Sequence, residues 1–328
     1  MMNREKYYFN SGPSRLGRRQ FLATNIAAFL AIGPAWAEDQ VKKAKRLRIQ
    51  FDEDGIQYVD PRRLVVALMG DPQIRMNPNS AGFARSAMSD LEKLPHDFLV
   101  VLGDLVQNNS QFYDEYESII LDKSTRPVLS VAGNADLNCG LDVYQDRTGM
   151  PLYFSIYRRG IRFIFLSVVA VVGPKTHICS LGKEQLTWLQ SQLAADKEAT
   201  TVVFHHAPMF ETTWRSEDRE SRPFPGSMYV HESKQMRELF RQHENVKVYA
   251  HGHVHHTYGV NDEFGRGEYC LQDGVLHISV GATANNRGSS FLVVEHDKII
   301  TQVRDHVGGK WRKQYDYVLE CKTTLKGL

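Results

Sequence analysis

Short apolar segments that end in metal-binding residue types recur along this chain of 328 residues. Continuous apolar runs of four to seven residues are typical of strands buried on both faces of a sheet. The runs are Leu64–Met69, Phe98–Leu102, Val128–Ala132, Phe163–Val169 and Thr201–Phe204. Amphipathic helices are expected at about 81–94, 183–195 and 233–242. This alternation of strand and helix predicts parallel βαβ units. After residue 246 strands follow one another, and residues 302–320 are expected to form a hairpin.

Polar residues stand where these strands end, and that placement is the strongest indication of function. In open α/β sheets, ligands gather just beyond the carboxyl ends of the strands. The strand ends read Gly70-Asp71, Gly103-Asp104, Gly133-Asn134, His205-His206 and His251-Gly252-His253-Val254-His255. A lone Asp there is usually a helix N-cap, and Asn beside Gly is usually a turn. Five such endings in one chain instead predict a single shared site.

The residue types in these endings suit a pair of metal ions. Two cations about 3.5–4 Å apart activate a water and neutralise the charge of a phosphoryl group. Such a site uses carboxylates, one of them bridging, together with imidazoles and an amide. The expected ligands are Asp71 and His255 for the first ion, Asp104 as the bridge, and Asn134, His253 and either His205 or His206 for the second. Histidines two apart on an extended segment point to one side, so His253 and His255 can act together.

The order of these motifs resembles that of the calcineurin-like metallophosphoesterases over about residues 63–300. The matching segments are Asp71-Pro72-Gln73, Gly103-Asp104, Gly133-Asn134-Ala135-Asp136, His206-Ala207-Pro208 and Gly252-His253-Val254-His255. Matching the His-x-Pro motif makes His206 the ligand. The resemblance implies an α/β fold, a four-layer αββα sandwich of two mixed β-sheets flanked by helices. It also implies hydrolysis of a small-molecule phosphate mono- or diester by a metal-bridging hydroxide, with Asp104, Asn134 and His253 as catalytic residues. Two ions of Mn, Fe or Zn are the implied cofactors.

Two positions depart from the family pattern. Gln73 replaces the usual His, so its neutral amide oxygen would be a weaker ligand for the first ion. Ala135 replaces a His that resembles a general acid, and losing such a group typically costs about 10²–10⁴-fold in rate. His205, His231 and His251 are candidate replacements. The alternative reading is a metal- or phosphate-binding member of the fold with little or no catalysis.

The N-terminus resembles a twin-arginine export signal. Arg18-Arg19 precede Phe21-Leu22, a short apolar stretch follows, and Ala35-Trp36-Ala37 offers a cleavage site. The stretch is shorter than the ~20 residues that span a bilayer, so no stable membrane span is expected. We predict a signal peptide at 1–37, a lead-in at 38–62, the phosphoesterase domain at 63–300 and a C-terminal tail at 301–328. Export by the twin-arginine machinery, with a periplasmic location, is the expectation.

Charge and cysteine content bear on which other classes of protein this chain could belong to. The formal net charge is +2 and 24% of residues are charged, which does not indicate a nucleic-acid-binding protein. The four cysteines are widely spaced and form no CxxC pair, and their pairing stays open. The polar segment 211–226 follows a ligand strand. Its arginines, Arg215, Arg219 and Arg222, are either part of a solvated loop or bind a charged group of the substrate.

Overall fold

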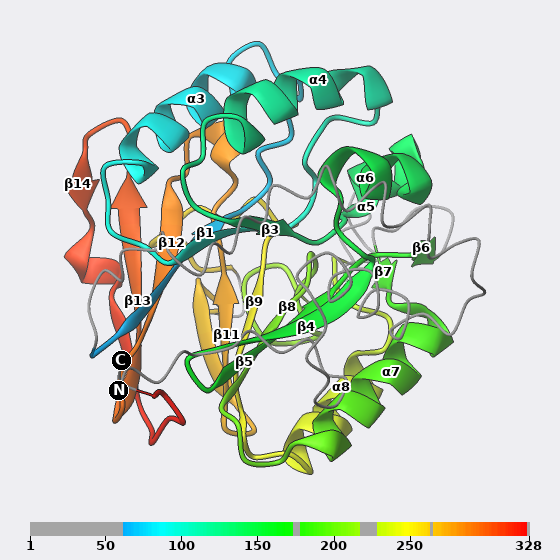
Figure 1. Cartoon of the computed structure of the whole chain (residues 1–328), viewed down its shortest axis with the longest axis vertical. Helices are drawn as coiled ribbons and strands as arrows, with labels where there is room; N and C mark the ends of the chain where they lie inside the picture. Colours follow the sequence, from blue (N-terminus) through cyan, green and yellow to red (C-terminus); the bar gives the residue numbers. More distant parts are fainter. Residues whose placement is uncertain (1–61, 173–177, 217–227, 263–264, 327–328) are drawn as a thin grey trace, which may run out of the picture.

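The computed structural model describes residues 62–172, 178–216, 228–262 and 265–326. The predicted signal peptide and nearly all of the lead-in lie outside these residues, as do Arg219 and Arg222. The described part forms two β-sheets that face each other, with helices on both outer sides (Figure 1). The predicted four-layer αββα sandwich is confirmed.

The first sheet is mixed and has the strand order β14-β13-β12-β1-β2-β3, with β15 beside β13. Its strands are β1 (Leu64–Met69), β2 (Phe98–Val101), β3 (Val128–Ser130), β12 (Ser289–Val294), β13 (Lys298–Asp305), β14 (Lys310–Trp311) and β15 (Tyr317–Glu320). β1, β2 and β3 are parallel, as predicted, whereas β12 pairs antiparallel with β1 and with β13. The expected C-terminal hairpin is formed by β13 and β14.

The second sheet has the order β10-β11-β9-β8-β5-β4, with β5, β8, β9 and β11 parallel. Its strands are β4 (Tyr153–Arg158), β5 (Ile161–Leu166), β8 (Thr201–Phe204), β9 (Val246–His251), β10 (Tyr269–Gln272) and β11 (Val275–Ser279). A separate ribbon joins β6 (Ala170–Val172) to β7 (Ile178–Ser180). β5 begins at Ile161, two residues before the expected apolar run, and its Arg162 is fully buried. The guanidinium of Arg162 donates to the carbonyls of Gln192 and Asp196, so its buried N–H groups have acceptors.

Helices cover the outer face of each sheet (Figure 1). They are α3 (Ser80–Leu91), α4 (Tyr113–Tyr116), α5 (Asn134–Cys139), α6 (Leu141–Thr148), α7 (Gly182–Ala195) and α8 (Ser233–Arg241). Short helical turns are η1 (Ser110–Phe112), η2 (Glu117–Leu121), η3 (Thr283–Asn285) and η4 (Lys313–Tyr315). α3 ends before the expected Leu94, since the residue preceding Pro95 disfavours helical backbone.

Alternating side chains of β5 show how the layers are held together. Phe163 and Phe165 belong to the main core that joins the two sheets, and Phe163 stacks on Phe204 of β8 with ring centroids 6.0 Å apart. Ile164 and Leu166 belong to a second core with α7 and α8. This two-sided burial explains why β5 reads as a continuous apolar run rather than an alternating one.

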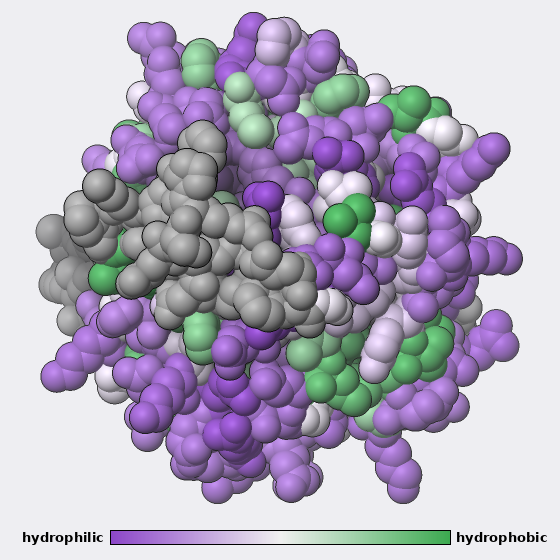
Figure 2. All heavy atoms as spheres, turned by 180° about the vertical axis from the view of Figure 1, so that it is seen from behind, coloured by the Kyte–Doolittle hydropathy of each residue, from purple (hydrophilic) through white to green (hydrophobic). Residues whose placement is uncertain are grey.

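The surface seen in Figure 2 is mainly hydrophilic, with one larger apolar area toward the lower right. No helix among the described residues combines the length and the apolar character needed to cross a bilayer. All four cysteines lie in the described part of the chain, and no disulfide joins them.

Candidate metal centre

The predicted ligands stand at the carboxyl ends of strands from both sheets. Asp71 follows β1, Asp104 follows β2 and Asn134 begins α5 directly after β3. In the second sheet, His206 follows β8, and His253 and His255 follow β9. Because the strands that carry them are parallel within each sheet, their ends meet along one edge of the sandwich.

Three of the predicted ligands for the first ion approach one another closely. One ligand atom each from Asp71, Asp104 and His255 lies within 4.8 Å of the others. Nε2 of His255 is 3.7 Å from Oδ1 of Asp71. Gln73 donates from Nε2 to Oδ2 of Asp104 at 3.3 Å, while its Oε1 is buried and has no hydrogen-bond partner. A buried amide oxygen without a donor is costly, and a cation would satisfy it.

The predicted ligands for the second ion form a tighter group. Nε2 of His206 is 3.0 Å from Nδ1 of His253 and 3.1 Å from Oδ1 of Asn134. Nε2 of His206 also lies 3.4 Å from Oδ1 of Asp104, the predicted bridging carboxylate. This distance links the two groups of ligands through Asp104.

Partners on the far side of each ring decide which nitrogens face the group. Nδ1 of His206 lies 2.8 Å from the carbonyl of Leu102 and donates to it, which leaves a lone pair on Nε2. Nε2 of His253 lies 3.9 Å from Sγ of Cys179. Burial lowers the pKa of His206 to about 3, so this imidazole is neutral at pH 7. The lone pair of His206 Nε2 and the amide oxygen of Asn134 therefore face each other across 3.1 Å, an arrangement that a bound cation would satisfy.

The carboxylates are also arranged for a cation. Asp71 is fully buried, and burial together with the nearby Asp104 raises its pKa well above the usual range. The backbone N–H of His253 donates to both oxygens of Asp71, at 3.0 and 2.9 Å. The backbone N–H of Ala135 donates to Oδ1 of Asp104 at 2.8 Å. Two buried carboxylates side by side repel each other, and a divalent ion between them would reverse that energy.

Local backbone conformation is unusual at these positions. Five predicted ligands have positive φ angles: Asp71 (39°), Gln73 (36°), Asp104 (50°), His253 (67°) and His255 (50°). Such conformations are costly for residues other than glycine and gather at functional sites. Glycines allow the close approach of the chains. A Cβ atom at Gly252 would lie 2.3 Å from Oδ2 of Asp71, and one at Gly133 would lie 2.3 Å from Oδ1 of Asp104.

The residues suggested as a replacement acid lie in different surroundings. His205 and His251 are fully buried, and His231 is exposed just before α8. Nδ1 of His205 accepts from the backbone N–H of Ala207 at 3.0 Å. Nε2 of His251 lies 2.8 Å from the hydroxyl of Thr213. Ala135 is itself buried, and its main chain contributes the hydrogen bond to Asp104.

Two neighbours of the predicted ligands carried no signal in the sequence. Nδ2 of Asn285 lies 3.1 Å from Nδ1 of His255, and Cys179 lies against His253. Asn285 belongs to η3, which packs beside β1 through the bond from Thr283 N–H to the Gly70 carbonyl. Both contacts join segments distant in the chain, so residue spacing could not reveal them.

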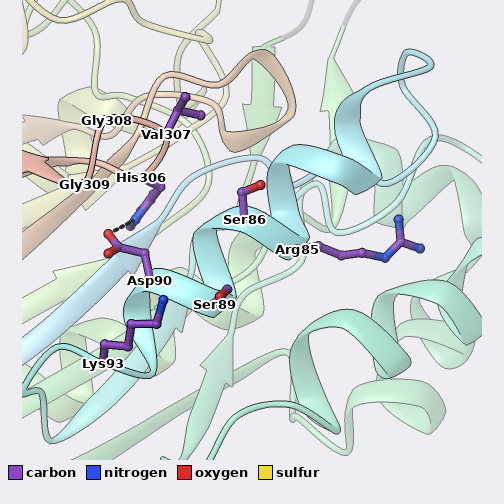
Figure 3. Close-up of a pocket in the computed structure, with 9 residues that line it drawn as sticks. All are labelled: Arg85, Ser86, Ser89, Asp90, Lys93, His306, Val307, Gly308 and Gly309. Atoms are coloured by element: carbon purple, nitrogen blue, oxygen red, sulfur yellow. Dashed lines mark hydrogen bonds and ion pairs between the residues drawn. The ribbon is translucent and has the colours of Figure 1, made fainter.

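A separate hollow lies on the surface between α3 and the loop that joins β13 to β14 (Figure 3). Its volume is about 520 Å³, and its lining includes Arg85, Asp90, Lys93 and His306. In Figure 3 the ring of His306 faces the carboxylate of Asp90, and the two groups lie 3.0 Å apart. None of the predicted metal ligands lines this hollow.

The model of the calcineurin-like phosphoesterase family matches residues 64–257 of this chain. The chain belongs to this family. A curated relative from a Synechococcus species, named "Probable cyclic nucleotide phosphodiesterase", is 24% identical over 212 residues, covering 61% of this chain and 76% of the relative. Membership supports phosphate-ester hydrolase activity in general and implies divalent metal ions.

Solved structures share the calcineurin-like phosphoesterase fold with this chain. A dimetal phosphatase from Danio rerio matches with a TM-score of 0.58 at 15% identity, covering 78% of this chain and 98% of that one. GAP50 of Plasmodium, described as the anchor in the inner membrane complex, matches with a TM-score of 0.57 at 14% identity, covering 81% and 90%. A purple acid phosphatase from yellow lupin matches at 0.56 and 16% identity, covering 80% and 55%. At these identities the likeness concerns the fold alone.

Proposed function

We propose that this protein is a dinuclear metal-dependent phosphoesterase that hydrolyses small-molecule phosphate mono- or diesters. The observation that carries the proposal is the position of His206 Nε2, which lies 3.0 Å from His253 Nδ1 and 3.1 Å from Asn134 Oδ1. Nε2 of His206 and Oδ1 of Asn134 are both acceptors, so a cation between them would satisfy both atoms. The buried, unpartnered Oε1 of Gln73 supports a second position on the other side of Asp104.

The donor set suits two ions of Mn, Fe or Zn. Asp71, Gln73, Asp104 and His255 would hold the first ion, and Asp104, Asn134, His206 and His253 would hold the second. When bound, such ions supply Lewis acidity that acidifies water and neutralises phosphoryl charge. The chain itself keeps the imidazoles neutral by burial and fixes the bridging carboxylate through the Ala135 N–H. It offers a methyl group at position 135, so leaving groups that need little protonation should react best.

The test compares wild-type protein with Asp104→Asn after loading with Mn²⁺, Zn²⁺ or Fe²⁺. Substrates are 4-nitrophenyl phosphate and bis(4-nitrophenyl) phosphate. Removing the bridging charge should lower kcat/KM by about 10³-fold or more, since both ions and the activated water depend on it. Bound metal is measured on the same samples by elemental analysis.

A matched control is Asp114→Asn, which removes one carboxylate from an exposed position on α4. It should leave both activity and metal content unchanged. Equal rates for wild type and Asp104→Asn would overturn the proposal.

One observation favours a second candidate, a metal- or phosphate-binding protein with little catalysis. Ala135 cannot donate a proton, so the usual general acid is missing at this position. This candidate predicts two bound ions in the wild-type protein but no metal-dependent turnover of either ester. The assays above separate the two candidates because metal content and rate are measured independently.

A further inference from the structure

Two arginines belong to segments that pack around His255, a predicted ligand of the first ion, and neither arginine is itself a predicted ligand. Arg287 follows η3, two residues after Asn285, whose amide lies 3.1 Å from His255. The Arg287 side chain is exposed, and among the described residues no hydrogen bond or ion pair of its guanidinium is found. The Cβ atom of Arg287 packs closely against Gly281: a Cβ atom added at Gly281 would lie only 2.7 Å from it. This close packing fixes the position of the first side-chain atom of Arg287.

Arg215 approaches from the turn that follows β8. Its guanidinium carbon lies 4.1 Å from the centroid of the Trp214 ring, a cation–π contact. Trp214 in turn packs against His256, the neighbour of His255, with ring centroids 5.4 Å apart. Arg215 also has a positive φ of 59°, so the turn holds it in a conformation that costs energy.

The turn that carries Arg215 is firmly anchored. The backbone N–H of Glu211 donates to the Ser216 carbonyl at 2.9 Å, and the Thr213 hydroxyl lies 2.8 Å from Nε2 of His251. Thr213 and Ser216 are fully buried. These contacts place Arg215 on a rigid support, which lowers the entropy lost when it binds a ligand.

Both arginines belong to segments that contact the surroundings of His255. Trp214, next to Arg215 in the chain, packs against His256, and Asn285, two residues before Arg287, contacts His255. Two guanidinium groups beside a predicted metal ligand raise the local potential for anions, and guanidinium is well shaped for phosphate oxygens. Arg287, taken alone, could be an ordinary solvated surface residue. That explanation does not account for Arg215, which is stacked on Trp214 and carried by an anchored turn.

We propose that Arg215 and Arg287 form a cationic rim that binds the second negative charge of a phosphate monoester, with Trp214 positioning Arg215. This inference rests on the proposed phosphoesterase function and adds a substrate class to it. A monoester carries close to two charges at pH 8, since its second pKa is about 6, whereas a diester carries one. The rim therefore selects dianionic monoesters over monoanionic diesters.

The experiment measures kcat/KM at pH 8 for 4-nitrophenyl phosphate and bis(4-nitrophenyl) phosphate. Arg287→Ala and Arg215→Ala should each lower the monoester value by about 10-fold or more, chiefly through KM, because each removes a charge-assisted hydrogen bond. The kcat/KM value for the diester should stay within about 3-fold of wild type, because the diester lacks the second negative charge that the rim binds. Trp214→Ala should resemble Arg215→Ala, and Trp214→Phe should retain most of the activity.

Two controls keep the result interpretable. Arg241→Ala removes one positive charge from α8, where Arg241 pairs with Asp273 at 3.2 Å, and should change neither substrate. The 4-nitrophenyl ester of thymidine 5′-phosphate is a diester and is assayed with and without a 3′-phosphate. This comparison tests whether the rim binds a charge remote from the reacting phosphate rather than the second charge of a monoester. A loss confined to the 3′-phosphorylated diester, or an equal loss for monoester and diester, would overturn the proposal.

Failure of this inference is distinguishable from failure of the proposed function. If wild type hydrolyses both esters and the arginine variants match it, the rim is wrong and the phosphoesterase stands. If wild type hydrolyses neither ester, calorimetric titration of the metal-loaded protein with inorganic phosphate still tests the rim. Arg287→Ala should then weaken phosphate binding by about 10-fold, and unchanged binding would refute the rim.

Discussion

The orientation of single side chains decides whether this cluster can bind a metal. The structure places the amide nitrogen Nδ2 of Asn285 3.1 Å from Nδ1 of His255, and turning the amide by 180° would present its oxygen instead. Only the oxygen can accept from Nδ1–H, and only that tautomer leaves a lone pair on Nε2 toward Asp71. We predict that Asn285 turns its oxygen toward His255 when metal binds, and so acts as a positioning residue of the kind that commonly orients metal-binding histidines.

Replacing Asn285 separates this role from simple packing. Asn285→Leu removes the acceptor and should weaken binding at the first metal position by about 10- to 100-fold. Asn285→Asp keeps an acceptor of the same shape and should stay close to wild type. Metal affinity is measured by competition with a chromophoric chelator. If both variants lose affinity equally, Asn285 does not set the tautomer.

At the scale of elements, one acidic side chain adds an ionic link between α3 and the first sheet to the apolar packing of this helix. Asp90 accepts from Nε and Nη2 of Arg304 on β13, at 2.7 and 2.8 Å, and pairs with His306. These hydrogen bonds with Arg304, partly offset by burial, lower the pKa of Asp90 below its usual value. Asp90 and His306 line the surface hollow in Figure 3, and their contact there serves to join α3 to the loop after β13.

The Asp90 contact predicts a pH-dependent contribution to stability. A carboxyl whose pKa is lower in the folded state stabilises the fold above its unfolded pKa of about 3.9, and the effect is lost as pH falls through the folded value. Asp90→Asn should lower the free energy of unfolding by about 1–3 kcal/mol at pH 7. Urea denaturation at several pH values measures this. A difference from wild type that does not shrink below pH 4 would contradict the assignment.

For the whole molecule, much of the architecture could be predicted from periodicity and composition. β1 matches its apolar run from Leu64 to Met69, because both of its faces are buried. Helices α5 and α6 were not predicted, since Asn134–Cys139 and Leu141–Thr148 are short and lack a clear apolar stripe. The cluster was foreseeable because its members follow strands directly. Asn285 and Arg287 were not, since their roles depend on where η3 packs.

Without metal, the protein should be destabilised by repulsion between two buried carboxylates. Asp71 is fully buried beside Asp104, so without a cation the two carboxylates destabilise the fold. Asp71→Asn should therefore raise the Tm of the metal-free protein by about 2–4 °C, equivalent to about 1 kcal/mol for a domain of this size. The same variant should lose the rise in Tm that metal gives to wild type. Calorimetry with and without a chelator measures both, and a lower Tm for the metal-free variant would refute the argument.

Ligands from both sheets have a mechanical consequence for catalysis. If one pair of ions is held by β1, β2 and β3 on one side and by β8 and β9 on the other, sliding of one sheet over the other changes every coordination distance together. The stacked rings of Phe163 and Phe204 fill the space between the sheets and set their separation. Turnover in this protein should then respond to the volume of side chains buried deep in the sandwich, far from any atom that touches the substrate.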